Sequence, residues 1–148
     1  MGEDGGSTQF PKALEGLTLF LVGKAGLAGL RHGEAALRPF ELRPREFWTL
    51  AVIEELGDAP QQSIANRLAI DRSDMVAIID KLQSLGMVTR ARDPQDRRKQ
   101  IIRLSVKGRR VFTRASKSLT AADNEFLTSL TKAQREQIRS SLARLAES

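Results

Sequence analysis

Residues 88–105 read VTRARDPQDRRKQIIRLS, and this pattern is typical of a β-hairpin with a charged tip. Apolar or small residues alternate with arginines before Pro94, and the alternation resumes in the segment IIRL. A period of two residues predicts a strand, and the proline separates the two arms. We therefore expect two paired strands joined by the segment DPQDRRK.

Positive charge is concentrated in and directly after this hairpin. The 148-residue chain has 24 Lys and Arg against 18 Asp and Glu, a net charge of +6. Residues 88–114 alone contain ten basic and two acidic residues, so the rest of the chain is slightly acidic. A basic segment of this kind indicates a polyanionic partner, of which double-stranded DNA is the first candidate.

Two short helices are expected to precede the hairpin and to meet at a tight turn. The first carries Ile64, Ala65 and Leu68 on one side, and the second carries Met75, Ile78, Ile79, Leu82 and Leu85. Asp71 is the predicted cap of the second helix, with Asp74 reaching back to it, and Gly86 ends it. The other face of this helix presents side chains suited to base edges, namely Arg72, Ser73, Val76, Ala77 and, one turn further on, Lys81. A solvated helix face is the alternative interpretation of the same residues.

Longer helices are expected on both flanks. Apolar residues at steps of three and four from Pro11 predict one helix to about Leu37 that is apolar on more than one side and needs a partner. A helix from Pro44 to Leu56, stopped by Gly57, follows. After the hairpin, caps at Ser105 and Thr131 predict a long helix and a last one. Residues 1–10 are interpreted as a flexible tail.

The chain resembles the multiple-antibiotic-resistance regulator (MarR) family over roughly residues 12–146. The resemblance is carried by Leu82, Gly86, Val88, Arg90, Asp93-Pro94, Asp96-Arg97-Arg98, Leu104, Ser105 and Gly108. It implies a single domain over 11–148 of mainly α class with a small β-hairpin wing (α+β). Within it, about 44–104 would form a winged helix-turn-helix, and 11–40 and 105–148 would supply dimerisation helices.

The resemblance also implies roles for individual residues. Asp96 would orient Arg98 so that its guanidinium enters the DNA minor groove, with Arg97 and Lys99 on phosphates. Arg72, Ser73, Val76 and Ala77 would lie at the start of the recognition helix, and Lys81 and Arg90 complete the predicted DNA-binding set. The alternative for Asp96 and Arg98 is a surface ion pair that only closes the hairpin. Val76 and Ala77 stand where relatives often have Thr or Ser and Arg, and Arg43 where a capping Thr is usual, so the operator sequence stays open.

A ligand-responsive repressor that binds a pseudo-palindromic operator as a homodimer is the function that the resemblance implies. Its effector would be a small aromatic or phenolic molecule between the dimer helices and the DNA-binding lobe. Phe47, Trp48, Arg31 and His32 are candidates to border such a crevice, although core or surface roles are the commoner use of such residues. The alternative is an architectural or protein-interaction winged-helix module without ligand control.

Composition argues against other classes. The chain has no Cys and one His, which excludes disulfides, thiol-based sensing and most metal or triad sites. No Gly-rich phosphate loop is present, so we expect neither an enzyme nor a cofactor. The most apolar stretch is interrupted by Glu15 and Lys24, and the acidic N-terminus does not resemble a secretion signal. A cytoplasmic protein without a membrane segment is the expectation.

Overall fold

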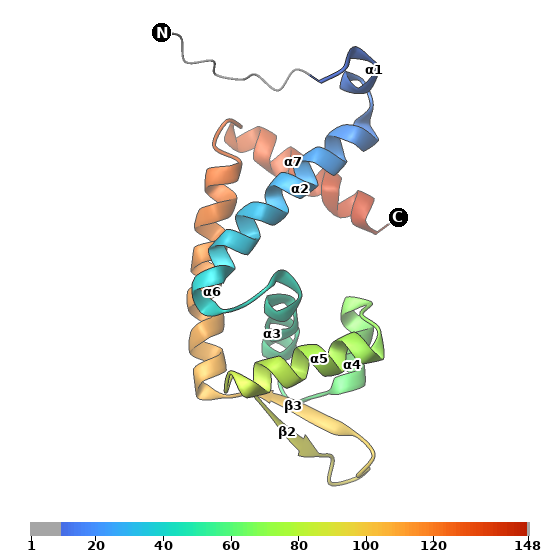
Figure 1. The fold of residues 1–148 in the computed structure, drawn as a ribbon, viewed down its shortest axis with the longest axis vertical. Helices are drawn as coiled ribbons and strands as arrows, with labels where there is room; N and C mark the ends of the chain where they lie inside the picture. The colour runs from blue at the N-terminus through green and yellow to red at the C-terminus, as the bar shows by residue number, and fades with distance from the viewer. Residues whose placement is uncertain (1–9, 148) are drawn as a thin grey trace.

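The computed structural model describes residues 10–147 as a mainly helical protein with a small sheet (Figure 1). Along the chain the elements are α1 (Lys12–Glu15), α2 (Thr18–Leu37), the 3-10 helix η1 (Arg38–Phe40), α3 (Pro44–Leu56), β1 (Ala59–Pro60), α4 (Gln61–Leu68), α5 (Arg72–Ser84), β2 (Val88–Arg92), β3 (Gln100–Leu104), α6 (Val106–Phe126) and α7 (Lys132–Ala146). This order confirms the predicted fold class.

The N-terminal helix differs from the prediction of one continuous helix. α1 ends at Gly16, Leu17 is extended with φ −90° and ψ 107°, and α2 begins at Thr18. The break falls at a glycine, a residue that is costly inside a helix. Of the predicted tail, residues 1–9 lie outside the described part of the chain. The Phe10 ring packs edge-on against Phe20, with 5.1 Å between centroids.

A winged lobe, residues 42–104, contains most of the core. α3, α4 and α5 meet around Leu50, Ile64 and Ile79, and the sheet contributes Ile102, all with 0% exposure. This confirms the apolar faces that the periodicity predicted for the two short helices. The core holds α5 on α3 and α4 and leaves the opposite side of α5 in solvent.

Asp71 caps α5 as expected, but Asp74 does not return the bond. The Asp71 Oδ1 accepts from the backbone N–H of Asp74 at 2.9 Å. The Asp74 carboxylate instead pairs with Arg45 Nη1 of α3 at 3.0 Å, so the prediction of a reciprocal capping box is wrong. A cation on a neighbouring helix competes for the short Asp side chain, and sequence periodicity does not report that neighbour.

The sheet is antiparallel with the order β1-β3-β2. The predicted hairpin is present, and its register runs from Val88 opposite Leu104 to Arg92 opposite Gln100. The third strand was not predicted. β1 pairs Ala59 with Ile102, and its two residues are too short to display the alternation by which strands are predicted.

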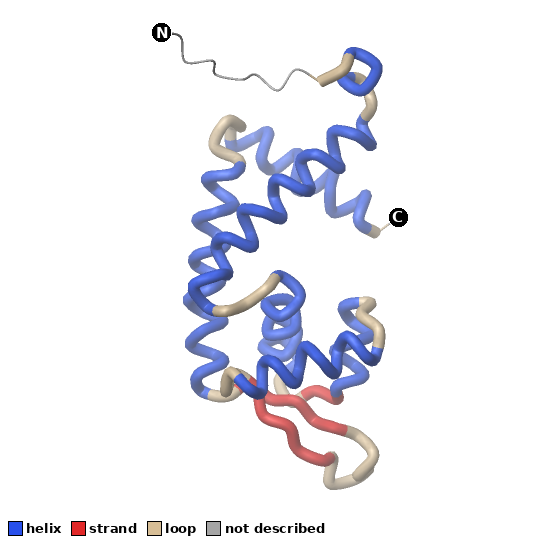
Figure 2. The backbone as a smooth tube through the Cα atoms, viewed as in Figure 1, coloured by secondary structure: helices blue, strands red, loops and turns tan. Residues whose placement is uncertain are grey.

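The start of α6 joins the winged lobe to the terminal helices. Ser105 Oγ accepts from the Gly108 N–H at 2.9 Å, as the predicted cap requires, and donates to the carbonyl of Gly86 at 2.6 Å. A Cβ on Gly108 would lie 1.9 Å from the Met87 carbonyl oxygen, so only glycine allows this approach. Further along, α6 packs against α2 (Figure 2), where Ser118 Oγ donates to the Ala36 carbonyl at 3.0 Å.

Exposed apolar side chains gather in the terminal helices α2 and α7. Those in or next to these helices are Leu17, Leu19, Leu21, Val22, Leu27, Leu30, Leu142 and Leu145. None of the residues of α7 is buried, and α2 buries only Leu37. Within residues 10–147, the helices are too short or too polar to cross a membrane.

Candidate nucleic-acid interface

The recognition helix α5 presents its predicted reading face to solvent. Arg72, Ser73, Val76 and Ala77 are all exposed at or near its N-terminal end. Asp71 fixes that end, and the Ser73 hydroxyl and the Asp74 N–H hold the pKa of the Asp71 carboxyl below its ordinary value of 3.8. The cap therefore stays ionised, and it offsets the positive end of the helix dipole.

The tip of the wing, residues 93–99 between β2 and β3, is held by its own hydrogen bonds. Lys99 O accepts from Asp93 N at 3.0 Å, and Asp96 O accepts from Lys99 N at 2.8 Å. Asp96 Oδ1 accepts from both the backbone N–H and the Nε of Arg98, at 3.1 and 3.4 Å. The Arg98 side chain is 94% exposed, so the aspartate orients a guanidinium that is otherwise in water.

A basic hollow joins the wing to the recognition helix. The hollow, of about 420 Å³, is lined by Arg72 of α5, by Arg98 and Lys99 of the wing tip, and by the first turn of α4, including Gln61 and Ser63. Pro60, the N-cap of α4, carries no side-chain acceptor, so the first N–H groups of this helix remain available to an anion. Three cations and a helix N-terminus around one hollow suit the negative charge of a phosphate backbone.

This part of the chain also matches a known family. The family model described as "MarR family" matches residues 42–99, which run from the residues before α3 to the end of the wing tip. The chain belongs to the MarR family.

Relatives and solved structures agree with the MarR assignment. The HTH-type transcriptional regulator TtmR of Methylorubrum extorquens is 31% identical over 99 residues, which are 67% of this chain and 51% of TtmR. The structure of CouR from Rhodococcus jostii RHA1 bound to p-coumaroyl-CoA is similar with a TM-score of 0.77 and 29% identity, over 92% of this chain and 96% of that one. The structure of the transcriptional repressor CouR bound to a 23-mer DNA duplex reaches a TM-score of 0.87 and 28% identity, over 93% and 99% of the two chains.

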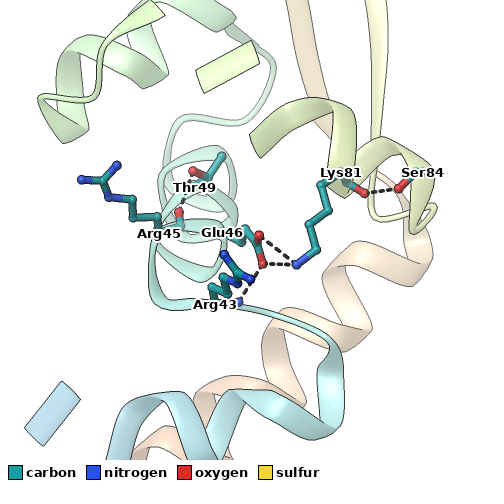
Figure 3. Close-up of polar contacts among 6 residues, drawn as sticks. All are labelled: Arg43, Arg45, Glu46, Thr49, Lys81 and Ser84. Atoms are coloured by element: carbon teal, nitrogen blue, oxygen red, sulfur yellow. Dashed lines mark hydrogen bonds and ion pairs between the residues drawn. The ribbon is translucent and has the colours of Figure 1, made fainter. Parts of the chain in front are cut away.

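Two cations of the predicted DNA-binding set lie apart from the others within this MarR fold. Lys81 directs its Nζ to the carboxylate of Glu46 in α3, at 2.8 and 2.9 Å (Figure 3). Arg90 pairs with Asp80 of α5 at 2.5 Å and donates to Gln83 Oε1 at 3.0 Å. The Lys81 contact thus connects α5 to α3, and the Arg90 contacts connect α5 to β2. In contrast, Arg97, Arg98 and Lys99 are exposed at the wing tip.

The residues of the α4 turn were missed by sequence reasoning. Gln61 lines the basic hollow, and its buried Oε1 has no hydrogen-bond partner among the described residues. The only local signal is a polar run, Gln61-Gln62-Ser63, after a proline at a helix start. Their relation to Arg98 depends on the packing of the sheet against α4, which the sequence pattern does not report.

A second hollow lies between α2, α3 and α5. This cleft, of about 580 Å³, is lined by apolar residues that include Leu30, Trp48 and Ile78, and by six charged residues, namely Glu34, Arg43, Arg45, Glu46, Asp74 and Lys81. Of the predicted crevice residues, Trp48 borders the cleft and is 47% exposed. Phe47 instead stacks on Phe112, and His32 packs on Phe126 beside a different hollow. Within residues 10–147, no group of three or more His, Asp or Glu side chains is arranged to hold a metal.

Proposed function

We propose that this chain binds operator DNA as a homodimer and represses transcription without catalysing a reaction, in the cytoplasm. The observation that carries the proposal is the basic hollow, because it brings Arg72 of the recognition helix beside Arg98 and Lys99 of the wing. The recognition helix would lie in the major groove, with Ser73, Val76 and Ala77 toward base edges. The Asp96–Arg98 pair would place its guanidinium in the adjoining minor groove, and Arg97 and Lys99 would contact phosphates.

The homodimer is supported by the exposed apolar residues of α2 and α7. Monomeric proteins seldom leave so many large apolar side chains in water on their terminal helices. If a second copy, related by a two-fold axis, packed its own α2 and α7 against these residues, the exposed apolar side chains of both copies would be buried. Such a dimer reads a pseudo-palindrome, with half-sites about one helical turn apart.

Ligand control is supported by the cleft that Trp48 borders. Apolar side chains line the cleft beside charged ones that could fix the orientation of a small molecule, and the similar CouR was solved with p-coumaroyl-CoA. We expect a small aromatic or phenolic effector here. Trp48 is the single tryptophan of the chain, so its fluorescence reports binding directly, and Trp48→Phe supplies the blank.

A titration of purified protein against duplexes from the promoter beside its own gene tests the function. Random duplex of the same length is the competitor, and salt is varied. Specific binding predicts two-fold-symmetric protection that resists competitor. If a dimer makes about ten phosphate contacts, log K falls with log salt at a slope near −9. Equal, weak binding to both duplexes would contradict the proposal and favour an architectural role.

A further inference from the structure

Glu46 has an unusual environment for a carboxylate. It is the only charged side chain that is buried among residues 10–147, with 6% exposure. Its Oε2 accepts from the backbone N–H of Arg43 at 2.7 Å, and both carboxylate oxygens accept from Lys81 Nζ (Figure 3). The hydrogen bond to Arg43 N closes the first turn of α3, where Arg43 itself has no acceptor to offer. The contacts to Lys81 connect α3 to the recognition helix.

Burial makes this ion pair different from the other contact between the same helices. A buried carboxylate is costly unless a cation and hydrogen bonds compensate it, so Glu46 constrains where Lys81 lies. Arg45 and Asp74 also join α3 to α5, but their side chains are 59% and 53% exposed. Water and salt screen such an exposed pair, and it contributes little. The position of α5 on α3 therefore depends electrostatically on Glu46.

The opposite flank of the recognition helix is held as well. Asp80, the residue before Lys81, pairs with Arg90 of β2, whose side chain is only 21% exposed. The second half of α5 is thus held between α3 and the wing. A helix is stiff, so a rotation at Lys81 displaces Arg72 and Val76 at the reading end.

We propose that Glu46 is a positioning residue for DNA recognition, which acts through Lys81 to set the orientation of α5. This inference rests on the proposed function and changes the part that Lys81 plays in it. The Lys81 ammonium binds the Glu46 carboxylate of the winged lobe and makes no phosphate contact. Loss of the pair affects the discrimination between operator and random DNA, because discrimination needs base edges at the right distance.

Three variants isolate this effect. Glu46→Gln keeps an oxygen for the Arg43 N–H, removes the charge, and replaces one of the two oxygens that accept from Lys81 with an NH2 group. Lys81→Gln removes the cation at a side chain that is 39% exposed, but it leaves the Glu46 carboxylate buried without that cation, so the double variant is the one to use if a single variant does not fold. The double variant E46Q/K81Q leaves no charge buried without a partner. Arg45→Gln is the matched control, since it breaks the exposed pair between the same two helices.

Affinity for operator and random duplex is measured over a range of salt. We expect each single variant to lose on the order of tenfold in operator affinity, which corresponds to about 1.4 kcal/mol, with random-duplex affinity unchanged. The double variant should lose no more than either single variant, because both substitutions remove the same pair. Arg45→Gln should match wild type. Losses that simply add in the double variant would overturn the proposal.

The salt slope separates positioning from direct phosphate binding. If Lys81 touched phosphate in each half of a dimer, Lys81→Gln would lower the slope by about 1.8, at about 0.9 for each phosphate that is no longer neutralised. We expect no such change, and a drop of that size would overturn the proposal. If the wild-type protein bound operator no more tightly than random duplex, the proposed function would be overturned instead. In that case, hydrogen exchange of the backbone amides of α5 still tests the positioning role of Glu46. The inference requires faster exchange in Glu46→Gln than in Arg45→Gln, and equal exchange rates in the two variants would overturn it.

Discussion

The winged lobe and the terminal helices use the same kind of apolar stripe but bury it differently. In the winged lobe, Ile64 and Ile79 have 0% exposure, whereas Leu19 in α2 is 90% exposed and Leu145 in α7 is 59% exposed. The first region completes its core within one chain, and the second does not. An amphipathic pattern therefore reports that a face needs burial, but not whether the same chain provides the cover.

The largest expected effect is on the stability of the winged lobe. Leu82 of α5 has 0% exposure, so Leu82→Ala leaves a cavity that should lower the free energy of unfolding by about 2–5 kcal/mol. Urea denaturation followed by circular dichroism measures the change. A loss below about 1 kcal/mol would show that the core around α5 is looser than described.

Substitutions on the terminal helices should weaken dimer association more than they lower the stability of the fold. Leu19→Glu places a charge on the surface proposed for a second copy, and it should weaken the dimer by about 1.5–3 kcal/mol for each leucine no longer buried. Sedimentation equilibrium measures this. Leu56→Glu, at a 43% exposed leucine of α3, is the control that should leave association unchanged. A Leu19→Glu protein that still dimerises like wild type would place the partner surface elsewhere.

The wing should matter for DNA and not for the fold. Arg98 is 94% exposed, so Arg98→Ala removes almost no packing, and it should weaken operator binding by about 1–3 kcal/mol for each site. A fluorescence anisotropy titration at fixed salt measures the change. Arg139→Ala, which removes an exposed cation of α7 paired with Asp123, is the comparison. Equal affinities for the two variants would exclude the wing from the interface.

The smallest effect concerns acid stability at the base of the wing. Asp58 accepts from Arg103 of β3, and this hydrogen bond is the main reason why the pKa of Asp58 lies below its ordinary value of 3.8. A lowered folded pKa stabilises the protein above the unfolded value, and the contribution disappears as pH falls through the folded one. In urea midpoints from pH 6 downward, Arg103→Gln should therefore show a shallower acid decline than wild type. Parallel declines would mean that the pair is irrelevant to folding.

Local signals were sufficient for the wing and for the cap of the helix that follows it. Ser105 caps α6 because its hydroxyl reaches the Gly108 N–H three residues on, and the two strands of the hairpin follow from the alternation on either side of Pro94. The Asp96–Arg98 contact was likewise expected from the resemblance of the wing motif. Each of these features joins residues close in sequence or residues that repeat with a fixed period, which is why a linear pattern reports them.

Contacts across the fold were not predictable in the same way. The short strand β1 exists because Ala59 pairs with Ile102, and the basic hollow exists because the α4 turn lies beside the wing tip. These features depend on distances between segments far apart along the chain.

The sequence by itself determined the helical faces, their caps and the concentration of positive charge around the hairpin, because periodicity and local hydrogen bonding act over a few residues. Only the tertiary structure decided which cations face solvent and which hold the recognition helix. Lys81 falls outside the apolar stripe of α5, a position that predicts a solvent-exposed side chain. It nevertheless donates a hydrogen bond to Glu46, 35 positions earlier in the chain. The physical reason is that a carboxylate buried by the packing of α3 requires a cation, and Lys81 of α5 supplies it.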